Sequence, residues 1–377
     1  MIYSLTNPSF SALIFYTIFN LIIFIPVGVS IIFKNDYLDK NKFFFLFLST
    51  IFLLFAGLRY EVGGDWLSYL RYFDVNQNLT IFHIFESPEF IYHLLIWVTH
   101  KLDYNFIFLN FSLQFIFYFL LFGISIKQKN LAFLYFLYFP TVVFFFSYGF
   151  IRQGIACLIV YYGIIFINEK KLKLDYISIF IIIATGFHLT ALFFFLFLLI
   201  EHLKKIKITR IILIGIIILS LFLYKPFLNL FLNKFEHYIL REYTSSEGYY
   251  FRYLIHLIPA SIYLFFTRKK IENNIENLFY TQLSIFNIIM IMPSLLFGIT
   301  TIFDRFLLYS LPFQAISLSL FISILKNNYL RNFSIIIICL CYLLYFMFWM
   351  IMNERLDMWE YNFFNYGFYE DLKIIEL

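Results

Sequence analysis

Four short polar stretches stand out in this chain, because each places ionisable side chains directly beside a long apolar run. They are RYEVGGDWLSY at 59–69, YGFIRQ at 148–153, GFHLT at 186–190 and DRFLLY at 304–309. Charged and polar groups are costly at membrane depth, so those that persist there are candidates for function. Their side chains are the first place to look for a binding or catalytic site.

Arginines in three of the stretches could bind a phosphate or pyrophosphate group. Arg59, Arg152 and Arg305 each lie at the end of an apolar run, and a guanidinium binds phosphate oxygens in pairs while it keeps its charge. Gly63 and Gly64 add a turn whose backbone N–H groups could face the same anion. The structural alternatives are an arginine that extends to lipid headgroups and a glycine pair that serves only loop geometry.

Three side chains in the same stretches are candidates for a general base: Asp65, His188 and Asp304. Burial can move the pKa of a carboxylate or an imidazole toward neutral pH, where proton acceptance from a hydroxyl is most effective. The structural alternatives are a charge pair of Asp304 with Arg305 at a helix start and a hydrogen bond from His188 to a carbonyl of a neighbouring helix.

The composition places these stretches in a membrane protein. Of the 377 residues, 62% are hydrophobic, 24% aromatic and only 14% charged, whereas a soluble domain has about 45–50% apolar and about 25% charged residues. A soluble globular domain and a disordered chain are both excluded. The net charge of +5 comes from clusters of lysine and arginine between apolar runs, which is typical of membrane topology and not of nucleic-acid binding.

Other residue types in the apolar runs are expected to be structural. Cys157, Cys339 and Cys341 form no CxxC pair, so neither a zinc site nor a disulfide framework is indicated. We expect no metal and no cofactor. The phenylalanine runs 144–146 and 193–195 are expected to face lipid.

The apolar runs are long enough for many membrane-spanning helices, each of which needs about 20 residues. They lie near 10–33, 43–58, 105–126, 131–147, 149–168, 209–224, 251–267, 278–299, 303–325 and 332–352. Residues 89–101 are short and contain two histidines, which favours an interfacial or re-entrant helix. Residues 174–203 have lysine-rich loops on both sides, and such loops face the cytoplasm. We therefore expect a hairpin of two short helices there, with His188 near its outer apex.

The charge distribution predicts the topology of the chain. Segments assigned to the cytoplasm contain 17 of the 28 lysine and arginine residues but only 7 of the 23 acidic residues; they are 34–42, 127–130, 168–175, 201–210, 268–277 and 326–331. All four polar stretches then fall on the outer face, although they were not used to set the topology. The fold class expected is an all-α polytopic membrane protein, one domain over residues 1–377, with about twelve transmembrane segments and both termini outside. Outer loops are expected at 59–104 and 225–250, the second with an interfacial helix.

The polar stretches also resemble the motifs of a known family. FAGLRYEVGGDWLSYLRYF at 55–73 resembles the hallmark of the EpsG family of polysaccharide polymerases, which is related to the Wzy-type O-antigen polymerases. SYGFIRQGIA at 147–156, GFHLTAL at 186–192 and DRFLLYSL at 304–311 resemble later motifs of that family, in the same order. The resemblance extends from about residue 45 to 325.

The resemblance implies a GT-C-like glycosyltransferase in the cytoplasmic (inner) membrane of a bacterium, with its active site facing outward. It would transfer a glycan from undecaprenyl pyrophosphate onto another lipid-linked repeat unit, and its further partners would be membrane lipid, a chain-length regulator and a flippase. By motif match, Arg59, Arg152 and Arg305 would hold the pyrophosphate, and Asp65 or His188 would be the base. Residues with a positioning role would be Asp304, Gln153, Tyr69 and Tyr309. Fixed cations stabilise the leaving group without a metal.

Two other functions compete with a polymerase. A flippase, which is a transporter, is expected to carry charges through the middle of the membrane and preferably two matching halves, whereas the polar residues here gather at one face. An O-antigen ligase shares the donor chemistry and differs in its acceptor. The sequence favours the polymerase and leaves both alternatives open.

Overall fold

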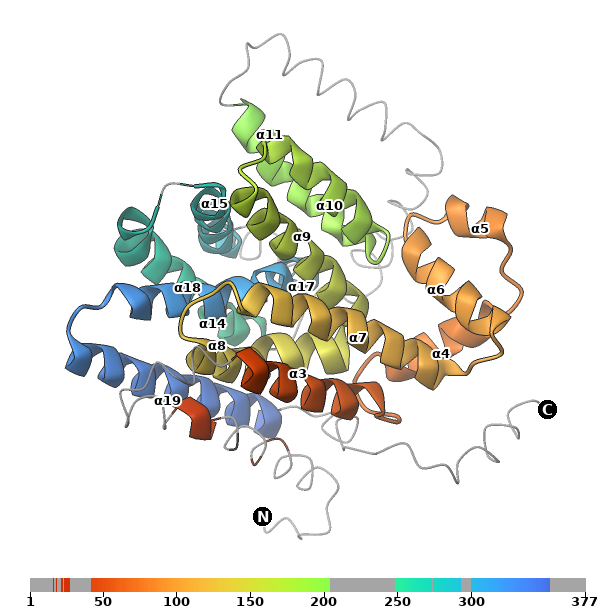
Figure 1. Cartoon of the computed structure of the whole chain (residues 1–377), viewed down its shortest axis with the longest axis horizontal. Coiled ribbons are helices and arrows are strands. Elements are labelled where there is room, and N and C mark those ends of the chain that lie inside the picture. Colours follow the sequence, from red (N-terminus) through yellow and green to blue (C-terminus); the bar gives the residue numbers. More distant parts are fainter. Residues whose placement is uncertain are drawn as a thin grey trace. The chain divides into compact units, whose positions relative to one another are not determined.

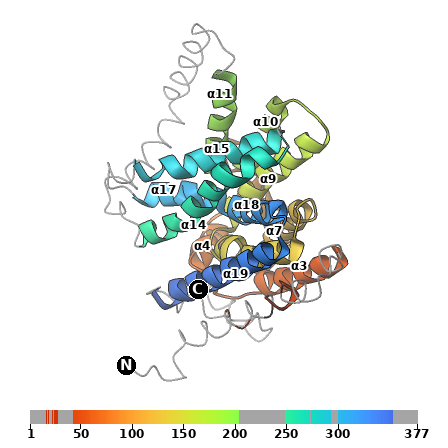
Figure 2. The same ribbon diagram turned by 90° about the vertical axis from the view of Figure 1, so that its left-hand side faces the viewer.

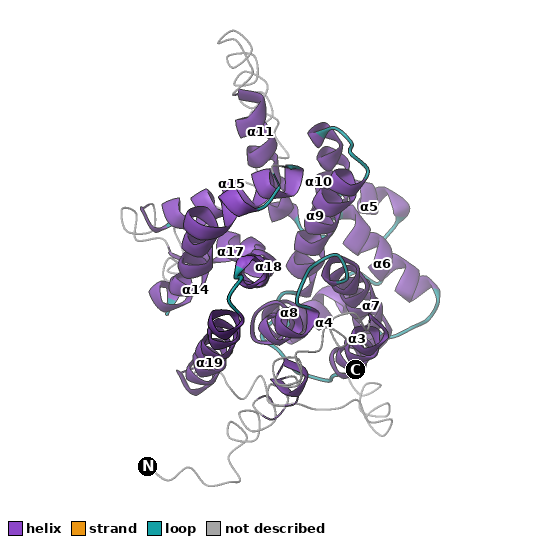
Figure 3. Ribbon diagram, turned by 60° about the vertical axis from the view of Figure 1, so that its left-hand side comes forward, coloured by secondary structure: helices purple, strands orange, loops and turns teal. Residues whose placement is uncertain are grey.

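The computed structural model of the chain describes residues 42–203, 248–272, 274–292 and 300–352, together with positions 16, 18, 22 and 24–27 (Figure 1). Within these ranges the chain forms helices joined by turns (Figure 3). It divides into two compact units. Unit 1 comprises Met1–Tyr162, Ile183–Leu189 and Ile322–Leu377, and unit 2 comprises Gly163–Ile182 and Thr190–Phe321.

Unit 1 contains the helix pair α3 (Lys42–Gly57) and α7 (Phe106–Ser125), which pack along each other. The close approach requires Gly57, because a Cβ there would lie 2.7 Å from the ring of Phe111. α8 (Leu131–Tyr138) continues into the π-helix η1 (Phe139–Gly149), and both pack against α19. The other helices are α4 (Trp66–Val75), α5 (Ile81–Glu86), α6 (Phe90–Lys101), α19 (Asn328–Met352) and α9 (Ile151–Glu169), which continues into unit 2 after Tyr162.

Unit 2 contains α14 (Tyr249–Ile262), which packs against α15 (Ile275–Ile289) and α17 (Thr300–Leu307) (Figure 2). α17 is followed by the 3-10 turn η7 (Leu308–Ser310) and by α18 (Leu311–Ile324). The remaining elements are η2 (Leu174–Tyr176), α10 (Ile177–Thr185), η3 (Leu189–Phe194), α11 (Phe195–Leu203), the π-helix η5 (Tyr263–Thr267) and η6 (Arg268–Lys270). The last residues of α10 and α18 and the first residue of η3 belong to unit 1.

Five helices in the described part of the chain are long and apolar enough to cross a membrane. They are Phe106–Ser125, Leu131–Gly149, Ile151–Glu169, Phe303–Ile324 and Asn328–Met352. The chain is therefore a polytopic helical membrane protein, as the sequence predicts, and each of these helices begins and ends within a few residues of a predicted apolar run. The predicted span 209–224, most of 10–33 and nearly all of the loop 225–250 lie outside the described residues.

The break expected within 174–203 is present. α10 ends at Thr185, and the next helical segment begins at Leu189. The residues between them are the glycine, phenylalanine and histidine of the third polar stretch, and the main-chain N–H of His188 still bonds back to the carbonyl of Ala184 at 3.0 Å. His188 therefore lies in the turn between two short helical segments.

The expectation that the phenylalanine runs face lipid is wrong for residues 144–146. All three rings are buried within unit 1. Phe144 packs edge-on against Phe346 of α19 at 4.9 Å and against Trp349 at 5.2 Å between ring centroids. In the second run Phe194 is buried as well. Hydropathy alone does not separate these environments, since protein interior and lipid are equally apolar.

Candidate active site

The end of α3 is fixed by a side chain from α7. Asn110 donates hydrogen bonds from Nδ2 to the carbonyl oxygens of Ala56 at 3.1 Å and Gly57 at 2.8 Å. The last carbonyls of a helix have no partner within the helix, so a buried helix end needs such a donor. These hydrogen bonds therefore fix the position at which α3 ends and the first polar stretch begins.

Arg59 lies in the interior of unit 1 and is only 1% exposed. Its Nη1 donates a hydrogen bond of 2.7 Å to the carbonyl oxygen of Ser147, near the end of η1. The guanidinium lies 5.5 Å from the ring centre of Trp66 and 5.2 Å from that of Tyr148, within the range of a cation–π interaction. Burial lowers the pKa of this guanidinium, while Tyr148 opposes the shift. Arg59 therefore joins the first polar stretch to the second.

The two glycines that follow have different roles. Gly63 has φ +101°, and a Cβ on it would lie 1.8 Å from the carbonyl oxygen of Tyr148. Only glycine fits such a backbone conformation at such a short distance. Gly64 has no heavy atom within 4 Å of the position of a Cβ. The turn thus requires the first glycine for close approach to η1, and the second lies beside open space.

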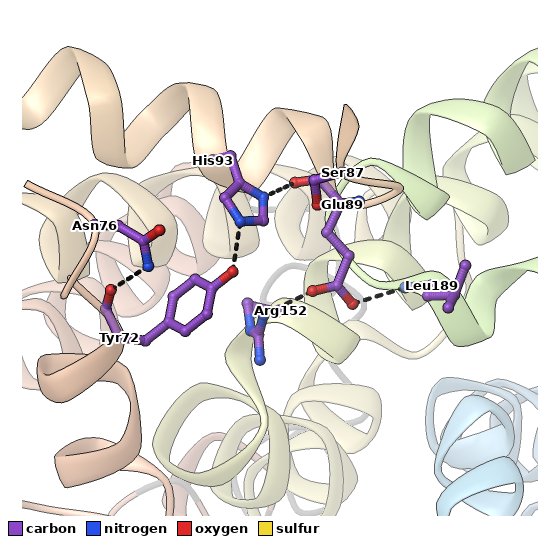
Figure 4. Close-up of polar contacts among 7 residues, drawn as sticks. All are labelled: Tyr72, Asn76, Ser87, Glu89, His93, Arg152 and Leu189. Atoms are coloured by element: carbon purple, nitrogen blue, oxygen red, sulfur yellow. Dashed lines mark hydrogen bonds and ion pairs between the residues drawn. The ribbon is translucent and has the colours of Figure 1, made fainter. Parts of the chain in front are cut away.

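Arg152, in the first turn of α9, lies within a group of three tyrosines. Its guanidinium carbon is 5.0, 5.9 and 4.6 Å from the ring centres of Tyr69, Tyr72 and Tyr92. Nη1 donates a hydrogen bond of 2.8 Å to Oε2 of Glu89 (Figure 4). The side chain of Arg152 is 21% exposed and that of Glu89 is 16% exposed. Arg152 therefore both reaches solvent and belongs to a polar cluster.

The third polar stretch is held against the start of α6. The carbonyl oxygen of Gly186 accepts hydrogen bonds from the backbone N–H groups of Ile91 and Tyr92, at 2.9 and 3.0 Å. The N–H of Leu189 donates to Oε1 of Glu89 at 3.0 Å. A Cβ at Gly186 would lie 2.6 Å from the side chain of Ile91, so a larger residue there would force that side chain to move. The turn that contains His188 is thus fixed on both sides of that residue.

A histidine that the sequence analysis did not select completes the cluster. Nδ1 of His93 lies 3.0 Å from the carbonyl oxygen of Glu89, and Nε2 bonds the hydroxyl of Tyr72 (Figure 4). A carbonyl can only accept, so Nδ1 carries the hydrogen and Nε2 of a neutral ring accepts from the tyrosine. Burial raises the pKa of Tyr72, which keeps its hydroxyl protonated as this bond requires.

Three of the four polar stretches therefore meet in unit 1, through Arg59, Gly63, Arg152 and the 186–189 turn. Asp65 precedes α4, and its carbonyl oxygen accepts from the N–H of Tyr69 at 2.9 Å. Gln153 is buried next to Arg152. Besides His93, sequence reasoning missed Glu89, because S-P-E-F at 87–90 is an ordinary helix start.

The fourth stretch belongs to unit 2 and forms contacts of its own. Asp304 accepts from both Nε and Nη2 of Arg252, at 3.3 and 2.8 Å, which is a two-point ion pair between α17 and α14. The hydroxyl of Tyr309 lies 2.6 Å from that of Thr190. Arg305 is half-buried. Asp304 thus pairs with Arg252 of α14, whereas the sequence analysis offered a pair with the neighbouring Arg305 as the structural alternative.

Comparison with known families agrees with the motifs. The model of the EpsG family matches residues 42–368, which contain all four polar stretches. The chain belongs to the EpsG family. The EpsG family is of the Wzy-like polymerase type, so the chain is a membrane protein related to polysaccharide synthesis. No curated protein and no solved structure matches the chain.

Proposed function

We propose that this EpsG-family protein is a polysaccharide polymerase at the outer face of the bacterial cytoplasmic membrane. It transfers a glycan from undecaprenyl pyrophosphate onto the sugar end of another lipid-linked repeat unit. The observation that carries the proposal is Arg152, a partly exposed guanidinium at the start of a membrane-spanning helix, in contact with the turn that contains His188 through Glu89.

Arg152 is suited to the pyrophosphate of the donor. Its Nη1 donates to Oε2 of Glu89, whereas its buried Nε has no hydrogen-bond partner in the described part of the chain, and a guanidinium has five N–H groups. Donors therefore remain for a second anion. The tyrosine rings around it leave the guanidinium only partly exposed to water, and a lower local dielectric constant strengthens the attraction between this cation and a phosphate.

The transfer step requires a base and a stabilised leaving group. The base takes the proton of the acceptor hydroxyl. The oxygen of that hydroxyl forms a bond to the anomeric carbon of the donor. The bond from that carbon to the phosphate oxygen breaks, and undecaprenyl pyrophosphate departs with the electron pair. Arg152 balances the negative charge that develops on the departing oxygen, which is electrostatic stabilisation of the transition state.

We assign the base to His188 ahead of Asp65 and Asp304. The contacts of Gly186 and Leu189 fix the backbone on both sides of His188 and connect it to the same carboxylate as Arg152. Asp304 is engaged at both oxygens by Arg252, which suits a positioning role. Arg59 is buried and stabilises the fold of unit 1, and Tyr69, whose ring contacts the guanidinium of Arg152, is expected to contact substrate.

The proposal is tested by deleting the gene in its own strain and displaying the surface polysaccharide on a gel. A polymerase predicts that the ladder of chain lengths collapses to a band with a single repeat, and that the wild-type gene restores the ladder. Loss of every surface-linked band with accumulation of lipid-linked units would contradict the proposal. Units on the cytoplasmic side would then indicate a flippase, and units on the outer side a ligase.

A further inference from the structure

Glu89 occupies an unusual position for a carboxylate at the start of a helix. It is the residue before α6, where acidic side chains commonly bond the first N–H groups of their own helix. Glu89 forms no such bond. The carbonyl oxygen of Gly186 accepts from the N–H groups of Ile91 and Tyr92 in its place. The carboxylate is thereby released to bond other parts of the chain.

The two oxygens of Glu89 bond two different elements. Oε2 accepts from Nη1 of Arg152 at 2.8 Å, and Oε1 accepts from the N–H of Leu189 at 3.0 Å (Figure 4). These partners lie 63 and 100 residues away in the sequence. One side chain thus fixes both the candidate pyrophosphate arginine and the turn that contains the candidate base.

The main chain of Glu89 is itself held in place. Its N–H donates to Oγ of Ser87 at 3.2 Å, and its carbonyl oxygen accepts from Nδ1 of His93 at 3.0 Å. A residue tied at its N–H, its carbonyl and both carboxylate oxygens has little freedom to move aside when an anion enters. These contacts indicate that Glu89 stays bonded to Arg152 when a phosphate binds, and that the phosphate does not displace it.

We propose that Glu89 is a positioning residue that sets the guanidinium of Arg152 and the 186–189 turn for the pyrophosphate of the donor. This role rests on the proposed polymerase function. Glutamine at this position has one acceptor oxygen and no charge, so it cannot serve both donors. Aspartate keeps the charge but is shorter by one methylene group, so it cannot reach both partners.

The experiment measures binding of undecaprenyl pyrophosphate to the purified full-length protein in lipid nanodiscs. Glu89→Gln is compared with wild type, with Arg152→Ala and with the double variant; Glu86→Gln, an exposed carboxylate at the end of α5, is the matched control. We expect Glu89→Gln to raise Kd about tenfold, as one lost charged hydrogen bond does, and to have no further effect in Arg152→Ala. Glu89→Asp is expected to lie between wild type and Glu89→Gln, and Glu86→Gln to bind as wild type does.

Hydrogen exchange at the amide of Leu189 gives a second readout that needs no ligand. Faster exchange there in Glu89→Gln, and not in Glu86→Gln, is the expected result, and unchanged exchange would overturn the positioning role. Binding by Glu89→Gln as tight as wild type, or tighter, would overturn the positioning role as well. The carboxylate would then have no effect on binding of the anion, or would compete with the anion for Arg152. Absence of binding by the wild type would instead overturn the proposed function, while the exchange experiment still tests the anchor.

Discussion

Arg59 donates a hydrogen bond of 2.7 Å to the main-chain carbonyl of Ser147, a residue 88 positions later in the chain. The carbonyl lies near the C-terminal end of η1, where the helix dipole favours a positive charge. Gln114 donates to the same oxygen at 2.6 Å. The buried guanidinium of Arg59 thus connects the first two family motifs. Arg152, in contrast, is partly exposed.

Arg59→Ala is expected to lower the stability of the protein. The change removes a buried side chain that packs between Trp66 and Tyr148. We expect it to lower the free energy of unfolding by about 2–4 kcal/mol, as other large-to-small substitutions in protein interiors do. Thermal unfolding of the purified protein in detergent measures it. Arg71→Ala, an exposed arginine of α4, is the control. An unfolding midpoint equal to that of wild type would contradict a structural role for Arg59.

The glycine pair gives a second prediction with an internal control. Gly63→Ala places a Cβ against the carbonyl of Tyr148 and in a backbone conformation that costs about 1–3 kcal/mol for a residue with a side chain. We expect little folded protein by size-exclusion chromatography of membrane extracts. Gly64→Ala, with open space around it, is expected to fold as wild type does. Equal yields of the two variants would contradict the turn.

The assignment of the base predicts different effects for three side chains. His188→Ala is expected to lower the rate of chain extension about 10²–10⁴-fold, as loss of a general base does. Asp65→Asn and Asp304→Asn are expected to retain more activity than His188→Ala. The measurement uses purified protein and the lipid-linked repeat units that accumulate in the deletion strain. A larger loss in Asp65→Asn than in His188→Ala would transfer the assignment to Asp65.

The helices could be predicted from sequence because hydropathy is a local property. The predicted run 105–126 became the helix Phe106–Ser125, and 303–325 became Phe303–Ile324. The break at 186–188 could be predicted from the lysine-rich loops on either side. The π-helical form of 139–149 could not, since its composition is the same as that of an ordinary apolar helix.

Local sequence patterns select candidate residues for the site, but they do not contain its tertiary contacts. Arg152 was found by its type and position, but the sequence does not indicate that Glu89, 63 residues earlier, is its partner. Likewise, the sequence does not indicate that Asp304 pairs with Arg252, 52 residues away. Only folding brings these charges together, so local sequence patterns do not predict which of them pair.

The central claim, that Arg152 serves the pyrophosphate of the donor, is tested most directly by complementation of the deletion strain with Arg152→Ala. Arg71→Ala is the control for an exposed arginine of the same region, and protein levels in the membrane are compared for all variants. The account predicts that Arg152→Ala, present at the wild-type level, leaves only the single-repeat band, while Arg71→Ala restores the full ladder. A full ladder with Arg152→Ala would contradict it.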